Sequence, residues 1–207
     1  MKHLVSFTYS VLAGAAISIG GAAFLASENR AVGAVLFSVG LFAVCTLGLN
    51  LFTGKICYVF QNPPAYAGEC VLIWLGNLAG AWLSGTALNL TRLDWGEKAG
   101  AICQAKLGDS LGSVFILAVF CNILIYLAVE SYRENPHQLG KYLGIFLGVS
   151  VFVLVGFEHC VANMFYFTVG RAWSPKTVLY LLVMTAGNAL GGVLFPLAKK
   201  WKAAAEK

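Results

Sequence analysis

Six long apolar runs constrain this chain more than any other feature of its sequence. Each is about 20 residues or longer, which is the length that an α-helix needs to cross a bilayer. Five of them contain no charged residue: His3 to Ser27, Ala31 to Gly54, Cys70 to Thr91, Ser110 to Val129 and Thr177 to Ala198. The sixth, Tyr142 to Gly170, is interrupted only by Glu158 and His159. The runs predict six transmembrane helices.

The composition excludes a soluble protein. With 59% hydrophobic and 11% charged residues and a mean hydropathy of +0.77, the chain has too few charges to cover a globule of 207 residues. A membrane β-barrel would instead show short segments that alternate between polar and apolar residues. We therefore expect an all-α membrane protein in which residues 1–207 form a single transmembrane domain.

Two of the runs are too long to be straight helices. Residues 31–60 and 140–170 would each extend about 45 Å as continuous helices, whereas the apolar core of a bilayer is about 30 Å thick. We expect the second span to break at Gly48–Gly54 and the fifth at Gly156–Asn163. Non-helical backbone survives at membrane depth only where protein or a water-filled cavity satisfies its polar groups, so the two breaks predict the lining of a passage.

The two halves of the chain share a short sequence pattern. The pattern GNxxG occurs in the third span, where its asparagine is Asn77, and again in the sixth, where it is Asn188. Because each half holds three spans, the second half would be inserted upside down, which predicts an inverted repeat of about residues 1–91 and 106–198 with the breaks near the midplane. We interpret the two asparagines as hydrogen-bonding links between helices rather than as ligands.

An acid and an imidazole lie side by side in the fifth span. Ionisable groups at membrane depth are costly unless they face a cavity or a polar partner, so Glu158 and His159 indicate a transport or proton pathway. A histidine suits this role because its ordinary pKa, about 6.5, can be moved across physiological pH by its surroundings. Two plainer interpretations stay open: a packed histidine bonded to a carbonyl, and a Glu158 that pairs with Lys106 to hold the fold.

Other classes of protein fit less well. A serine hydrolase would need a nucleophile elbow such as GxSxG, which the sequence lacks. His3 and His137 lie near the expected membrane edges and the cysteines form no CxxC pair, so we expect no enzymatic activity, no metal and no cofactor. The basic tail at 199–207 is interpreted as an anchor at the lipid headgroups, not as a nucleic-acid site. A neutral-solute channel of the aquaporin type stays open on topology alone, although the twin Asn-Pro-Ala boxes are missing.

Three pieces of sequence carry a resemblance to a known family. Leu51-Phe52-Thr53-Gly54 and Gly156-Phe157-Glu158-His159, the latter followed by Ala162-Asn163-Met164-Phe165, resemble the two signatures of the formate/nitrite transporter family. The resemblance implies a homopentamer whose protomers each carry a pore, with an aquaporin-like arrangement of helices. It also implies passage of small monovalent anions of weak acids, formate or nitrite foremost, with a hydrosulfide channel as the alternative. The chain departs from the family at Asn50, where many members have an acidic residue.

The same resemblance assigns residues to the pore. It implies a pore histidine at His159, with Thr53 facing it and Glu158 beside it. It places Lys106 and Asn122 in the fourth span. Apolar constrictions are implied at Phe37, Leu41, Leu51, Phe52, Ile125 and Phe152. We expect an anion to be attracted by Lys106 and then stabilised or protonated at His159, while the apolar rings exclude bare ions.

The basic residues of the connecting segments favour an orientation with both termini in the cytoplasm, in a bacterial-type inner membrane. The inner side would then hold Lys2, Lys55, Arg133, Lys141, Lys199, Lys200, Lys202 and Lys207, and the outer side Arg30, Arg92, Lys98, Lys106, Arg171 and Lys176. Basic residues around the outer mouth either raise the local concentration of small anions or solvate the surface.

Overall fold

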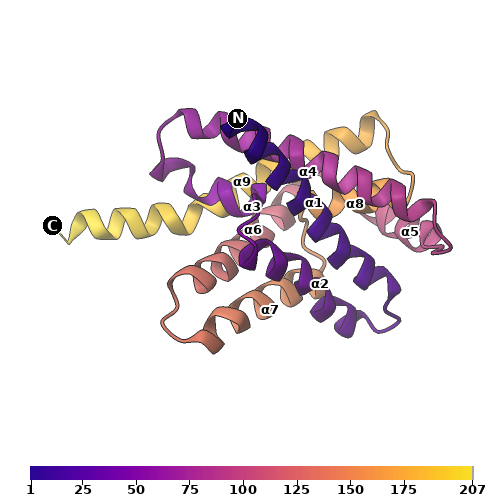
Figure 1. Ribbon diagram of the computed structural model, residues 1–207, viewed down its shortest axis with the longest axis horizontal. Helices are drawn as coiled ribbons and strands as arrows, with labels where there is room; N and C mark the ends of the chain where they lie inside the picture. Colours follow the sequence, from indigo (N-terminus) through magenta and orange to yellow (C-terminus); the bar gives the residue numbers. More distant parts are fainter. Residues whose placement is uncertain (207) are drawn as a thin grey trace.

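The structure, a computed structural model that describes residues 1–206, is in this part of the chain a bundle of α-helices without a strand (Figure 1). Its elements are α1 (Lys2–Ala26), α2 (Arg30–Thr46), α3 (Phe52–Lys55), the 3₁₀ helix η1 (Ile56–Gln61), α4 (Ala65–Asn89), α5 (Gly96–Leu107), α6 (Leu111–Glu134), α7 (Gln138–Val155), α8 (Cys160–Val169) and α9 (Pro175–Ala205). The expected all-α class is therefore confirmed. Lys207, expected in the basic tail, lies outside the described residues.

Five helices are long and apolar enough to cross a membrane, namely α1, α4, α6, α7 and α9. Large apolar side chains such as Leu36, Leu75 and Leu147 are exposed on the outside of the bundle, where lipid would cover them. α2 has 17 residues and α8 has 10, so both are shorter than a full span. These two helices lie in the runs for which a break was expected.

Both expected breaks are present, and each contains a glycine with a positive φ. Gly48 has a φ of +65° and Gly156 a φ of +91°, a conformation that glycine adopts without the steric cost that a side chain would bring. The helix resumes four residues after each glycine, as α3 and as α8. The breaks are shorter than the predicted segments 48–54 and 156–163, because the second part of each predicted segment is already helical.

Asn77 in α4 satisfies the polar groups of the first break. Its Oδ1 accepts a hydrogen bond of 2.8 Å from the backbone N–H of Phe52, the first residue of α3. Its Nδ2 donates to the backbone carbonyls of Ser10 at 2.8 Å and Asn50 at 2.9 Å. One fully buried amide thus joins the break to α1 and α4, so the helix can restart at membrane depth.

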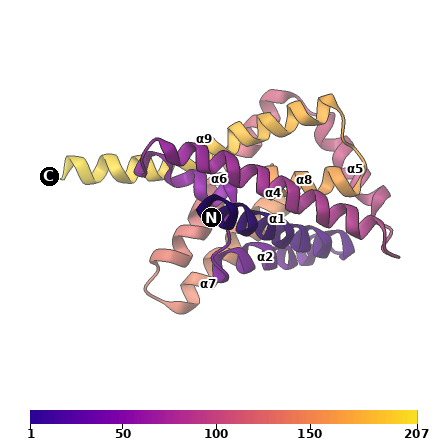
Figure 2. The ribbon, with the colours of Figure 1, turned by 45° about the horizontal axis from the view of Figure 1, so that its top comes forward.

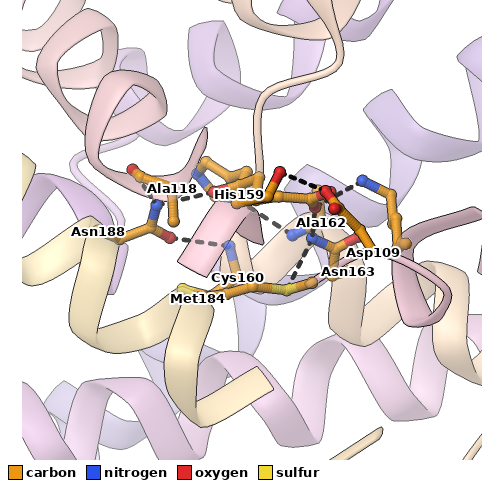
Figure 3. A network of polar contacts seen from close by, with 11 residues as sticks. Asp109, Ala118, His159, Cys160, Ala162, Asn163, Met184 and Asn188 are labelled. Atoms are coloured by element: carbon orange, nitrogen blue, oxygen red, sulfur yellow. Dashed lines mark hydrogen bonds and ion pairs between the residues drawn. The ribbon is translucent and has the colours of Figure 1, made fainter. Parts of the chain in front are cut away.

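Asn188 in α9 repeats this arrangement at the second break, as Figure 3 shows. Its Oδ1 accepts from the backbone N–H of Cys160 at 2.9 Å, and its Nδ2 donates to the carbonyls of Ala118 and Glu158, both at 2.8 Å. Each of these three partners lies 108 residues after the corresponding partner of Asn77. The interpretation of both asparagines as links between helices is confirmed by these contacts.

The helices of the two halves pack in corresponding ways. α1 packs against α2 and α4, and α6 packs against α7 and α9. The short segments pack against the opposite half of the chain: α8 of the second half packs against α4, and η1 of the first half packs against α9. Glycines make two of the crossings close: Gly80 faces the carbonyl of Val11 and Gly191 faces that of Val119, with no room for a methyl group. The centre of the bundle is thus built from the two breaks held between long helices.

The predicted position of Lys106 is wrong, because this residue lies in α5. The family resemblance implies a position in the fourth span, whereas Lys106 lies in a separate helix that ends at Leu107. A new helix begins because the Ser110 hydroxyl accepts a hydrogen bond of 3.2 Å from the N–H of Ser113 and so caps α6. α5 packs against α8, at the end of the molecule opposite to the projecting end of α9 (Figures 1 and 2).

The variant Gly191→Ala is expected to lower the stability of the fold by about 1–3 kcal/mol, because the new methyl group would overlap the carbonyl oxygen of Val119. The matched control is Gly68→Ala in α4, where nothing lies within 4 Å of an added methyl group. Alanine there should stabilise the helix by up to about 1 kcal/mol. Thermal denaturation in detergent measures both variants, and equal midpoints would contradict close packing at Gly191.

Candidate functional site

His159 joins the two helical segments that follow the breaks. It is the N-cap residue of α8, and only 2% of its surface is exposed. Its Nε2 lies 3.0 Å from the hydroxyl oxygen of Thr53, which is fully buried in α3. Its Nδ1 lies 3.1 Å from the backbone nitrogen of Ala162 and accepts that N–H. Both nitrogens of the ring therefore have a partner.

These two contacts determine the tautomer of the imidazole. A backbone N–H can only donate, so Nδ1 of His159 is the acceptor and carries no hydrogen. The ring is then neutral with its hydrogen on Nε2, which donates to the oxygen of Thr53. Because the threonine oxygen accepts this bond, the hydroxyl hydrogen of Thr53 remains available for another acceptor.

Glu158 and Lys106 form an ion pair next to the histidine. Lys106 Nζ donates to Glu158 Oε2 at 2.6 Å, and the side chains are 16% and 4% exposed. The Nδ2 of Asn163 donates to the same oxygen at 2.7 Å. A carboxylate with so little access to water is tolerated because it has a cation and a hydrogen-bond donor. The pairing of Glu158 with Lys106, one of the interpretations that the sequence left open, is thus present.

A cavity of about 610 Å³, the histidine cavity, opens beside this group. His159, Glu158 and Lys106 are among its lining residues, and Phe37 and Phe152 form an aromatic wall. The two phenylalanine rings meet edge to face with centroids 5.8 Å apart, and the Phe152 ring stacks on the imidazole at 5.5 Å. Aromatic rings therefore border the histidine in this cavity.

A second cavity, of about 540 Å³, is the tyrosine cavity, and its lining includes Leu41, Leu51, Gly54, Tyr58, Tyr66 and Tyr132. Within the described residues the two cavities share no lining residue. Thr53 lies between Leu51 and Gly54 in the chain, whereas its partner His159 lines the other cavity. Thr53 itself lines neither cavity, so the Thr53–His159 contact joins a lining residue of the histidine cavity to a buried residue whose chain neighbours line the tyrosine cavity.

The structure brings most of the predicted pore residues to this region. His159, Thr53, Lys106, Glu158, Phe37 and Phe152 surround the histidine cavity or contact its lining, and Leu41 and Leu51 line the tyrosine cavity. In the described part of the chain, neither cavity includes the buried residues Phe52, Asn122 and Ile125 in its lining. Asn122 donates instead to the backbone carbonyls of Thr53 at 3.1 Å and Asn188 at 2.7 Å, so it links α6 to α3 and α9.

Asn163 was not among the predicted pore residues. It lines the histidine cavity beside His159 and Met184, as Figure 3 shows, and its Oδ1 has no hydrogen-bond partner within the described residues. Such a buried acceptor is available to a donor that enters the cavity, for example water. Its position one helical turn after His159 is the sequence signal that identifies it.

Comparison with known proteins adds a family and several relatives. A family model described as formate/nitrite transporter matches residues 1–201. A probable formate transporter of Methanothermobacter thermautotrophicus is 32% identical, over 93% of this chain and 86% of its own length. The formate channel FocA of Escherichia coli strain K12 is 27% identical, over 97% and 87%. A solved structure described as a pentameric formate channel with formate bound matches with a TM-score of 0.83 at 25% identity, over 99% of this chain and 98% of its own.

The variant Lys106→Met is expected to lower the stability of the fold by about 3–5 kcal/mol, because it leaves the buried carboxylate of Glu158 without a cation. The double variant Lys106→Met with Glu158→Gln should recover most of this loss. The matched control is Lys199→Met, which breaks a pair whose lysine side chain is 66% exposed and should cost at most about 1 kcal/mol. Thermal denaturation in detergent compares the three, and a double variant no more stable than Lys106→Met would contradict the assignment.

Proposed function

This chain belongs to the formate/nitrite transporter family, and we propose that it conducts small monovalent anions of weak acids, formate or nitrite foremost, along a path past His159. Its relatives are formate channels and transporters rather than enzymes. The observation that carries the proposal is the buried contact between Thr53 and His159, since His159 lines one cavity and the chain neighbours of Thr53, Leu51 and Gly54, line the other.

Apolar side chains on both sides of this contact support selectivity for weak acids. Phe37 and Phe152 line the cavity on the histidine side, and Leu41 and Leu51 line the cavity on the threonine side. Transfer of a bare anion into such surroundings costs tens of kcal/mol unless the anion meets a donor or takes up a proton. The anion of a weak acid has the second option and chloride does not.

The Thr53 hydroxyl is the donor that the anion meets. The imidazole of His159 donates to the oxygen of this hydroxyl, so the hydroxyl hydrogen remains available to an anion that reaches Thr53. Direct proton donation by the neutral ring would leave an imidazolate. A second proton on Nδ1 would break the bond to Ala162 that caps α8. We therefore assign to the pair the stabilisation of the anion by a hydrogen bond, and to water in the cavities the supply of the proton.

An inverted repeat of six spans is part of the proposal. α2 with α3 then forms the broken second span and α7 with α8 the broken fifth. The recurrence of the asparagine contacts after 108 residues supports the correspondence of the two halves. The second half begins at α6, since the predicted start at residue 106 falls within α5.

We also propose a homopentamer in a bacterial-type inner membrane with both termini in the cytoplasm. The description of one relative as a pentameric formate channel supports the assembly, and its likeness covers 99% of this chain. The lysines at both ends of the chain support the orientation, since Lys2, Lys199, Lys200 and Lys202 lie at the termini.

Uptake by reconstituted liposomes tests the function directly. Formate, nitrite, hydrosulfide and chloride are offered over a series of external pH values. We expect uptake of the first three to rise as the external pH falls, because a proton accompanies the anion, and chloride uptake to stay at the level of empty liposomes. Hydrosulfide uptake far above formate uptake would favour the hydrosulfide alternative. Osmotic swelling in a neutral solute without formate flux would favour an aquaporin-like channel and refute the proposal.

The variant Thr53→Val keeps the shape of the side chain and removes its hydroxyl. Formate flux should fall by about ten- to a hundredfold, because a hydrogen bond to a charged group is worth about 1.5–3 kcal/mol. The matched control is Thr8→Val on the exposed face of α1, where the hydroxyl bonds only to the carbonyl of Leu4 in its own helix. Equal loss of flux in both variants would contradict the role of Thr53.

The variant His159→Asn removes one of the two hydrogen bonds of the imidazole and keeps the other. Asparagine is a good N-cap residue and can still accept the N–H of Ala162, but it is too short to reach the hydroxyl of Thr53. Loss of the bond to Thr53 and of the stacking on Phe152 should lower the stability of the protein by about 1–3 kcal/mol, whereas formate flux should fall at least about tenfold. Thermal denaturation and flux are measured on the same preparation, and retained flux would refute the role of the histidine.

A further inference from the structure

The two cavities differ in the charges of their lining residues. The histidine cavity is lined by three basic and three acidic residues, Arg30, Lys98 and Lys106 with Glu28, Asp109 and Glu158. The tyrosine cavity is lined by two basic residues, Lys55 and Arg133, and within the described residues by no acidic one. The first lining is formally neutral and the second carries two positive charges.

Pairing makes the difference larger. In the histidine cavity, Lys106 is bound by Glu158, and Lys98 Nζ donates to the carbonyls of Leu25 at 2.7 Å and Ser27 at 2.6 Å. In the tyrosine cavity, Lys55 is half-buried, and residues 1–206 provide its Nζ with neither an ion pair nor a hydrogen bond. A lysine in this state keeps its charge available for a ligand.

The position of Lys55 follows from the first break. It ends α3, two residues after Thr53, and its backbone carbonyl accepts a hydrogen bond of 3.2 Å from the hydroxyl of Tyr66. The cation therefore lies in the same cavity as Leu51, on the side of the Thr53–His159 contact away from the histidine cavity. An anion held by Lys55 would be next to the apolar barrier.

Arg133 is held in place by an aromatic ring. Its guanidinium carbon lies 4.6 Å from the centre of the Tyr58 ring, and the Tyr58 hydroxyl donates to Glu130 Oε2 at 2.9 Å. The other oxygen of Glu130 is bound by Lys199 at 2.6 Å, so this nearby acid already has a cation. Glu69, the acidic neighbour on α4, accepts from Ser6 and lines a different pocket. Within residues 1–206 neither Lys55 nor Arg133 forms an ion pair, although Glu130 and Glu134 lie near enough to Arg133 to offset part of its charge.

The tyrosine cavity lies at the face that carries both chain termini. Lys2 and Tyr66 line a common neighbouring pocket, which places the N-terminus beside the cavity. Lys200 Nζ donates to the carbonyl of Phe60 at 3.2 Å, which places the start of the basic tail against η1. In Figures 1 and 2 the end of α9 projects at this side, away from α5.

We propose that the tyrosine cavity contains a binding subsite for a small monovalent anion such as formate, in which Lys55 is the main ligand and Arg133 the second cation. The proposal rests on the function proposed above. It assigns to this chain a stronger attraction of anions at one end of the proposed pathway than at the other. Coulomb attraction by two cations in a partly enclosed cavity raises the local concentration of anions, and salt screens it. Anions that enter from the face of the termini thus load the pathway at lower concentration than anions that enter from the other face.

Sided flux measurements test the subsite. Right-side-out and inverted membrane vesicles contain the full chain in opposite orientations, which protease digestion of a C-terminal tag identifies. The initial rate of formate uptake is measured against formate concentration in each. For Lys55→Gln we expect the half-saturating concentration to rise about three- to tenfold from the face of the termini, and to stay within about twofold from the opposite face. The rise should shrink at high ionic strength.

Three variants make the result specific. Lys55→Arg should restore the half-saturating concentration of the unmodified protein, because it keeps the charge. Lys202→Gln removes a positive charge from the same face, at a side chain that is 77% exposed and paired with Glu206, and should have no effect. Arg133→Gln should give a smaller rise than Lys55→Gln from the same face, and it tests the subsite independently if Lys55→Gln does not fold.

The outcomes separate the two proposals. Absence of formate flux by the unmodified protein from either face refutes the proposed function. Formate flux by the unmodified protein, combined with Lys55→Gln curves that are unchanged or shifted equally from both faces, refutes the subsite and leaves the function standing. A sided rise that Lys55→Arg reverses and Lys202→Gln does not reproduce supports the subsite.

Discussion

Buried backbone polar groups that have no helical partner are the constraint on which this structure depends. The helices α2 and α7 stop inside the bundle, and each would leave carbonyl and N–H groups without water. Asn77 and Asn188 supply the missing partners from neighbouring long helices, with three hydrogen bonds each. Because the amides satisfy the breaks, the side chains beside them, Thr53 and His159, are free to face each other instead of serving their own backbone.

Charge is distributed around this centre in a graded way. The carboxylate of Glu158 is the most deeply buried charge, and Lys106 and Asn163 neutralise and solvate it. Toward the face of the termini, Lys55 and Arg133 line a cavity whose described residues contain no acid. In the proposed function the neutral centre and the positive cavity have different tasks, since net charge attracts an ion over several ångströms whereas a directed hydrogen bond stabilises it at short range.

Much of this fold can be predicted from the sequence, for physical reasons. Apolar runs longer than a bilayer is thick require a break, and Gly48 and Gly156 mark where the breaks fall. The predicted breaks are longer than those in the structure. Hydropathy does not show that His159 accepts a backbone N–H and so starts the next helix within the predicted break. α5 was missed for a related reason: it is short and polar, so its existence follows from packing against α8 and not from an apolar run. The cavities, and hence the part played by Lys55, depend on contacts between distant segments that spacing alone does not reveal.

The imidazole that both caps α8 and donates to Thr53 cannot turn over without losing both bonds. A ring bonded at both nitrogens has one favoured orientation of its dipole. In the proposed function, an anion beside this ring meets a fixed donor geometry, and any gating movement is expected away from His159.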